Sequence, residues 1–99
     1  MRRVVWAHSA VDDFADALTF IARSDPGAAS SIADRIDDAV QRLEEHAVGR
    51  PGRISGTYEK PVRRTRYIIA YALEDEVLTI LRIIHTARDW TEEGWPIEA

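Results

Sequence analysis

The chain has 99 residues, of which 45% are hydrophobic and 30% are charged, with a formal net charge of −4. This length has room for one hydrophobic core, so we expect a single domain over residues 1–99. No apolar run reaches the roughly 18 residues of a membrane span, and the apolar run 4–7 is too short for a secretory signal, which predicts a cytoplasmic protein. The absence of cysteine excludes disulfides and cysteine nucleophiles, and the histidines lack metal-ligand spacing, so we expect no metal and no cofactor.

Charge is segregated along the chain. Residues 9–47 carry many more carboxylates than basic side chains. Residues 50–66 contain a single acidic residue, Glu59, among Arg50, Arg53, Lys60, Arg63, Arg64 and Arg66. Such a basic stretch suits nucleic acid or an acidic partner segment, because Lys and Arg exchange counterions for phosphates or carboxylates. A solvated loop is the alternative interpretation.

The chain is predicted to begin with a strand and a helix. Residues 4–7 are mostly β-branched and aromatic, which favours a strand. Ser9, followed by Asp12 three residues later, has the form of a capping box at the start of a helix. We expect this helix to end near Arg23, because apolar residues recur at helical spacing until that point: Val11, Phe14, Ala15, Leu18, Ile21 and Ala22.

A second helix is predicted after the turn at 24–27. Asp25 can accept hydrogen bonds from the first free backbone N–H groups, and Pro26 fits the first turn of a helix. We expect Gly49 to terminate this helix. Its apolar stripe consists of Ala29, Ile32, Ala33, Ile36, Val40 and Leu43, so the two helices should form an αα-hairpin.

The second half of the chain is predicted to be a β-meander. After a turn-rich basic linker at 50–53, residues 54–58 have the pattern of a short strand broken by Gly56. Residues 65–73 and 77–85 are dense in Ile, Val, Leu and Tyr, and a polar turn at 74–76 separates them. The expected class is therefore α+β in the order β-α-α-β-β-β, with the helical hairpin packed on a small, mainly antiparallel sheet.

The last predicted strand is apolar on both faces. By the two-residue period, Val77, Thr79, Leu81, Ile83 and His85 point one way, and Leu78, Ile80, Arg82 and Ile84 point the other. A strand of this kind lies in the centre of a sheet that is covered on both sides. We expect the helical hairpin to cover one face, and another element or a partner to cover the other.

At the joints between these elements the chain resembles the ParE/RelE toxins. In the first half the resemblance rests on Val5-Trp6, Ser9-Ala10, Asp13-Phe14, Ile21-Ala22, Asp25-Pro26 and Ala28-Ala29. In the second half it rests on 49–53 (GRPGR), Gly56-Thr57 with Glu59, 67–71 (YIIAY), 80–85 (ILRIIH) and 87–90 (ARDW). No single piece is specific, but their order and spacing are similar to those of the family. The resemblance implies the toxin half of a type II toxin–antitoxin pair.

Within this superfamily the resemblance leaves a choice between an enzyme and a binding inhibitor. RelE-like members resemble ribosome-dependent mRNA endonucleases and commonly carry an arginine directly after the tyrosine that begins the YIIAY-like strand, and a tyrosine in the C-terminal tail. Here the first position is Ile68, and residues 86–99 contain no tyrosine. If the chain were a ribonuclease, its catalytic candidates would be Arg82, His85 and Arg88. The ending LRIIHTARDW is more similar to ParE-like inhibitors of DNA gyrase, so the resemblance favours a binding inhibitor over an enzyme and leaves a ribonuclease as the alternative.

The expected target-binding residues lie on the basic, C-terminal side of the chain. They are Arg63, Arg64, Arg66, Arg82, His85, Arg88 and Trp90. Each has a structural alternative. Arg82 shares a predicted face with apolar residues, so it is expected either to be paired in a salt bridge or to line a groove. His85 could be a hydrogen-bonded structural residue, and Trp90 could fasten the C-terminus to the sheet.

The resemblance also implies a cognate antitoxin as partner. We expect an antitoxin segment to bury Leu78, Ile80 or Ile84 and to neutralise Arg63, Arg64 or Arg66. DNA gyrase is the expected target, and any sequence-specific DNA binding is expected of the antitoxin and not of this chain. We expect no membrane partner. A non-toxic family member that only binds an antitoxin is a third possibility.

Overall fold

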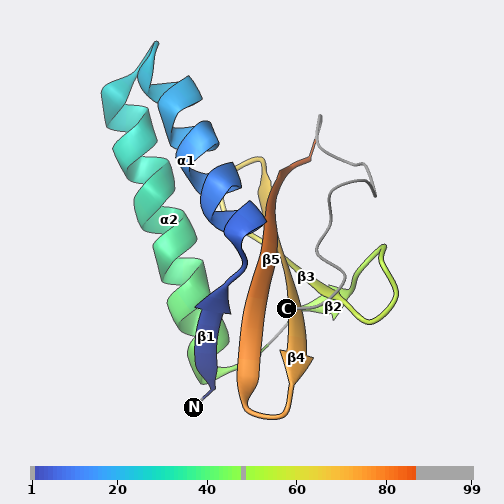
Figure 1. The fold of residues 1–99 in the computed structure, drawn as a ribbon. Helices are drawn as coiled ribbons and strands as arrows, with labels where there is room; N and C mark the ends of the chain where they lie inside the picture. The colour runs from blue at the N-terminus through green and yellow to red at the C-terminus, as the bar shows by residue number, and fades with distance from the viewer. Residues whose placement is uncertain (1, 48, 87–99) are drawn as a thin grey trace.

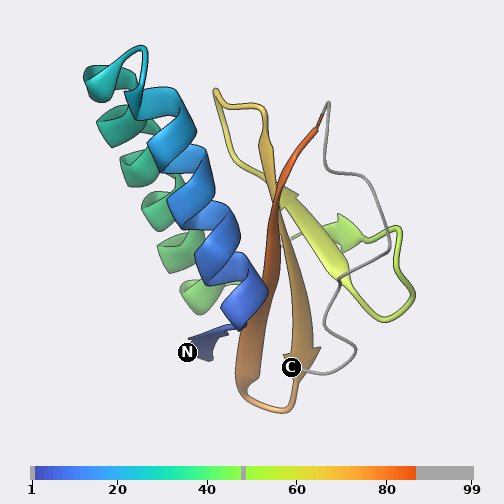
Figure 2. The same cartoon turned by 45° about the horizontal axis from the view of Figure 1, so that its top comes forward.

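The computed structural model describes residues 2–47 and 49–86. Its elements are, in chain order, β1 (Arg3–Trp6), α1 (His8–Ala22), α2 (Pro26–Glu45), β2 (Arg50–Pro51), β3 (Tyr58–Pro61), β4 (Tyr67–Glu74) and β5 (Val77–His85). The strands form one sheet in the order β1-β5-β4-β3-β2, in which β1 pairs parallel to β5 and the other pairs are antiparallel. The two helices form a layer against this sheet (Figures 1 and 2). The expected α+β fold is confirmed. None of the helices described is long and apolar enough to cross a membrane.

The start of α2 is as predicted, whereas the start of α1 is not. The Asp25 side chain accepts a hydrogen bond from the Ala28 N–H (3.0 Å), and Pro26 begins α2. The predicted capping box at Ser9 is wrong: α1 has Ala7 as its N-cap residue and no side-chain cap. The prediction that Gly49 ends α2 is also wrong, because the helix ends at Glu45.

The predicted strand at 54–58 is also wrong. Residues 53–56 form a bend and a turn, and β3 begins only at Tyr58. Gly56 has a φ of +84°, a backbone conformation that suits a turn and not a strand. The Gly52 N–H donates to the Thr57 carbonyl (2.8 Å), so the segment closes on itself between β2 and β3.

The β4–β5 hairpin is confirmed, and β5 is an interior strand of the sheet, between the edge strand β1 and the central strand β4. Its register contains an irregularity that the sequence pattern did not predict. Ala70 pairs with Arg82 and Tyr71 pairs with Ile80, which leaves Leu81 as an extra residue in β5. A bulge of this kind reverses the side-chain alternation, so the expected alternation along the whole of β5 is wrong.

The main core lies between the helices and the sheet. Its fully buried members include Ala10, Ile36, Leu43, Ile69, Tyr71, Leu78 and Ile80. Leu78 and Ile80, which we expected an antitoxin to cover, therefore already lie within the core, with 0% of their surface exposed. Ile84 lies outside this cluster but is also 0% exposed. The expectation that these three residues await a partner is wrong, because none has surface left to bury.

Candidate functional site

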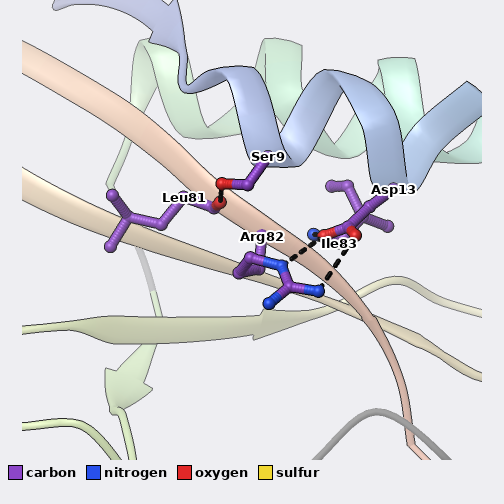
Figure 3. Close-up of polar contacts among 5 residues, drawn as sticks. All are labelled: Ser9, Asp13, Leu81, Arg82 and Ile83. Carbon is purple, nitrogen blue, oxygen red and sulfur yellow. Dashed lines mark hydrogen bonds and ion pairs between the residues drawn. The ribbon is translucent and has the colours of Figure 1, made fainter. Parts of the chain in front are cut away.

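The first candidate site is the joint where α1 crosses the edge of β5. Strand β1 pairs with β5 only as far as Trp6 and Ile80. Beyond that point, side chains of α1 bond the backbone of β5 in place of β1 (Figure 3). The Ser9 hydroxyl donates to the Leu81 carbonyl (2.9 Å), and Asp13 Oδ2 accepts from the Ile83 N–H (3.0 Å). Ser9 and Asp13 thus satisfy backbone groups that an unpaired strand edge would leave open.

The same aspartate binds Arg82. Arg82 Nε donates to Asp13 Oδ2 (2.6 Å) and Arg82 Nη2 donates to Asp13 Oδ1 (3.0 Å), which makes a two-pronged ion pair (Figure 3). The two side chains are only 16% and 17% exposed. The structural alternative for Arg82, a salt bridge, is therefore confirmed. Its guanidinium holds α1 to β5 as well as lining the pocket beside the pair.

The pocket beside the ion pair has a volume of about 440 Å³, and its lining includes both Arg82 and Tyr67, the first residue of β4. Asp16 and Phe20 from α1 line it on one side, and Tyr67, Arg82 and Ile83 on the other. The His85 ring meets the Tyr67 ring edge-on, with centroids 5.3 Å apart. Arg82 and His85 are thus brought together at one end of β4 and β5 through Tyr67. The other two candidates, Arg88 and Trp90, lie outside the described residues.

Arg63, Arg64 and Arg66 lie in the turn between β3 and β4 and are exposed. Hydrogen bonds hold this turn tightly: the Thr65 hydroxyl donates to the Val62 carbonyl (2.8 Å) and accepts from the Tyr67 N–H (3.0 Å). The Val62 N–H donates to the Tyr67 carbonyl (2.9 Å) and closes the turn. The arginines therefore project from a fixed backbone.

Two of these arginines line a pocket of about 240 Å³ between the turn and α2. Its charged residues are Arg35, Asp38, Arg42, Lys60, Arg63 and Arg64, and we name it the basic groove. Arg66 does not line it. Sequence reasoning missed Arg35, Arg42 and Lys60 as members of a site. Arg35 and Arg42 are seven residues apart, which places them on one helix face, but no local pattern indicates that this face meets the β3–β4 turn.

A second basic element, the loop from Arg50 to Arg53, was also missed as a candidate site. Glu59 is 3% exposed and accepts from the Arg53 N–H (2.9 Å) and from Arg50 Nη2 (3.4 Å). The only carboxylate of the basic stretch is therefore buried as the anchor of this loop. In the sequence, this loop could have been found from Glu59, the single acidic residue among basic ones. A carboxylate that becomes buried requires charged or hydrogen-bonding partners, and its neighbours supply them.

Tyr71 is a buried tyrosine on the same side of the sheet as the helices. Its ring stacks on that of Tyr58 at 5.6 Å, and its hydroxyl has no hydrogen-bond partner among the described residues. Burial raises the pKa of Tyr71 above the ordinary 10.0, as does neighbouring Tyr58, while Arg2 lowers it. In the described part of the chain no group of His, Asp or Glu side chains is arranged to hold a metal ion.

Solved structures with the same fold are toxins and toxin–antitoxin assemblies. A chain of the chromosomal ParDE toxin–antitoxin system from P. aeruginosa matches with a TM-score of 0.80 at 21% identity, over 86% of this chain and 96% of that one. The YoeB/ParE toxin from Agrobacterium tumefaciens matches with a TM-score of 0.58 at 15% identity, over 84% and 96%. The RelBE2 toxin–antitoxin complex from Mycobacterium tuberculosis matches with 0.54 at 24% identity, over 85% and 96%. At these identities the likeness establishes the fold.

Sequence comparison establishes the family. The chain is 35% identical over 92 residues to Y4kP of Sinorhizobium fredii, a protein whose name classes it as a candidate toxin, and the match covers 92% of this chain and 95% of that protein. The model of the family described as "ParE toxin of type II toxin-antitoxin system, parDE" matches residues 4–90. The chain belongs to the ParE toxin family of type II toxin–antitoxin systems.

Proposed function

We propose that this chain inhibits DNA gyrase by binding to it, and that a cognate antitoxin neutralises the inhibition. Membership of the ParE family supports the toxin role, and the ParDE assembly from P. aeruginosa, to which the fold is similar, supports an antitoxin partner. The observation that favours binding over RNA cleavage is the position after Tyr67. RelE-like enzymes commonly carry an arginine there, whereas this chain carries Ile68, which is 5% exposed.

The other candidate catalytic residues do not replace the arginine that is missing after Tyr67. Cleavage of RNA by its 2′-hydroxyl requires a base, an acid for the leaving oxygen and cations over the charged phosphorane. Arg82, the candidate cation on β5, is already bound through two nitrogens to Asp13. The tail from 86 to 99 contains no tyrosine. A gyrase inhibitor needs none of these groups, because it acts by binding.

An mRNA endonuclease that uses Arg82, His85 and Arg88 is the second candidate function. The observation in its favour is the fold similarity to the RelBE2 complex and to the YoeB/ParE toxin. Both candidates are toxins, so growth inhibition alone does not separate them. A non-toxic antitoxin-binding protein is the third candidate.

Expression of the chain alone in a bacterial host separates the three. Gyrase inhibition predicts filamentous cells with induced DNA-damage responses. Rapid translation arrest with cleaved mRNA would overturn the proposal in favour of the endonuclease, and normal growth would favour the non-toxic protein. Co-expression of the neighbouring antitoxin gene should restore division.

A variant test then asks whether the C-terminal side carries the activity. We expect His85→Ala with Arg88→Ala to reduce toxicity while the circular dichroism spectrum stays that of the wild type. Arg82 is kept in this variant because it binds Asp13, so that its removal would confuse loss of folding with loss of function. Wild-type toxicity of the double variant would move the target-binding surface elsewhere.

A further inference from the structure

The basic groove holds more positive charge than the described chain neutralises. It brings together Arg35 and Arg42 of α2, Lys60 of β3, and Arg63 and Arg64 of the β3–β4 turn. The carboxylate within it is that of Asp38, whose Oδ2 lies 4.0 Å from Arg42 Nη2 in an exposed pair. An exposed pair at that distance contributes little. Arg35 Nε donates only to the neutral Ser31 hydroxyl, at 3.4 Å.

The groove is also built in advance of any ligand. Arg63 and Arg64 project from the turn fixed by Thr65, and Lys60 lies in a strand that is paired with β4. Arg64 has a φ of 63°, where a non-glycine residue is strained, and yet the chain places an arginine there. Because the backbone that carries these side chains is already ordered, the turn itself loses little conformational entropy when an anion binds.

The surroundings favour a peptide carboxylate over a nucleic acid. Exposed Asp34 and Asp37 lie on α2 close to the groove in sequence, and a second pocket lined by Asp34 and Asp38 adjoins it through the shared Arg35. Duplex DNA carries one negative charge about every 1.7 Å, so a long polyanion would meet these carboxylates. A short acidic peptide could enter the groove alone. Ala39 and Pro61 supply apolar lining for its carbon atoms.

We propose that the basic groove binds an acidic segment of the cognate antitoxin, whose Asp or Glu side chains enter between α2 and the β3–β4 turn. This assignment rests on the antitoxin partner of the proposed function. It places the contact at Arg35, Arg42, Lys60, Arg63 and Arg64. It differs from the expectation made from the sequence, because it leaves out Arg66 and the buried residues of β5.

The test measures binding of short anionic probes to the purified full-length chain by fluorescence anisotropy. The probes are a labelled oligoglutamate peptide and a labelled single-stranded oligonucleotide of equal charge. The test variant is Arg42→Gln with Arg63→Gln, which removes one cation from each side of the groove. The matched control is Arg3→Gln with Arg23→Gln, which removes the same charge from exposed positions on β1 and after α1.

Binding of oligoglutamate should weaken roughly tenfold in the test variant, as expected for the loss of two exposed ion pairs, and stay unchanged in the control. The test variant should likewise bind the purified cognate antitoxin more weakly than the wild type does, and the control variant should bind it equally well. Equal losses in both variants, no binding of oligoglutamate by the wild type, or tighter binding of the oligonucleotide would each overturn the proposal. The binding assay contains no gyrase. Its result therefore tests the basic groove alone, and a failure of the proposed gyrase inhibition would leave it unchanged.

Discussion

Arg82 and the arginines of the basic groove carry the same guanidinium group but differ in their surroundings. Arg82 is mostly buried, and two of its nitrogens bind Asp13. Arg63 and Arg64 are exposed and share a groove with three other cations and one carboxylate. Sequence position on the basic side of the chain therefore does not define a binding residue. A charged side chain that is paired within the fold stabilises the fold. A charged side chain that the fold does not neutralise is available to a partner.

The largest expected effect is the loss of Asp13. Asp13→Ala should lower the free energy of unfolding by about 3 kcal/mol, because it leaves Arg82 partly buried without its carboxylate and the Ile83 N–H without its acceptor. Urea unfolding measures this change. The control is Asp16→Ala, an exposed residue of the same helix, which should change stability by less than about 0.5 kcal/mol. Equal effects of the two substitutions would show that the ion pair does not hold α1 to β5.

The next largest effect concerns the connection from α2 to the basic loop. A Cβ atom at Gly49 would lie 2.7 Å from Tyr71 Oη and 2.8 Å from the Glu59 carbonyl oxygen. Gly49→Ala should therefore cost about 1 to 3 kcal/mol, because a buried ring or a strand backbone must move. Gly27→Ala is the matched control: its Cβ would come no closer than 3.4 Å to Asp25, and alanine favours the first turn of α2. Thermal unfolding of both variants tests this, and a stable Gly49→Ala would contradict the close packing.

A smaller effect is expected from Tyr71→Phe, and it depends on pH. At neutral pH the variant should be as stable as the wild type or up to about 1 kcal/mol more stable, since it removes a buried hydroxyl that has no partner among the described residues. The folded state raises the pKa of Tyr71, so ionisation of the phenol opposes folding. This ionisation has no effect on the stability of the wild type below pH 10.0 and lowers it as pH rises from there through the folded pKa. Unfolding curves above pH 10.0 should thus favour the phenylalanine variant further. A constant difference between the two proteins across that range would contradict the shift.

The smallest effects on stability are expected in the basic groove. Arg63→Ala should leave the free energy of unfolding within about 0.5 kcal/mol of the wild type, because its side chain is exposed. Arg64→Gly should raise it by about 0.5 kcal/mol at most, since glycine adopts a φ of 63° without strain but loses more backbone entropy on folding. Denaturant midpoints of the two variants measure both changes. A large loss of stability from Arg63→Ala would mean that the groove, like Arg82, serves the fold.

The helical hairpin, the N-cap at Asp25 and the β4–β5 hairpin could be predicted, because each depends on local periodicity or on one cap residue. The extra residue at Leu81 could not be predicted, because a strand that is apolar on both faces has the same sequence pattern with or without a bulge. The role of Ser9 was mistaken for a cap, since its partner is the Leu81 carbonyl, distant in sequence. The basic groove was found only in part, because α2 supplies Arg35 and Arg42 from the acidic half of the chain.

Gyrase inhibition is tested by measuring DNA supercoiling by purified gyrase in the presence of increasing amounts of the purified chain. We predict that supercoiling is inhibited in proportion to the bound chain and that the cognate antitoxin restores it. Unchanged supercoiling at saturating concentrations of the chain, together with cleavage of mRNA on ribosomes by the same preparation, would contradict gyrase inhibition.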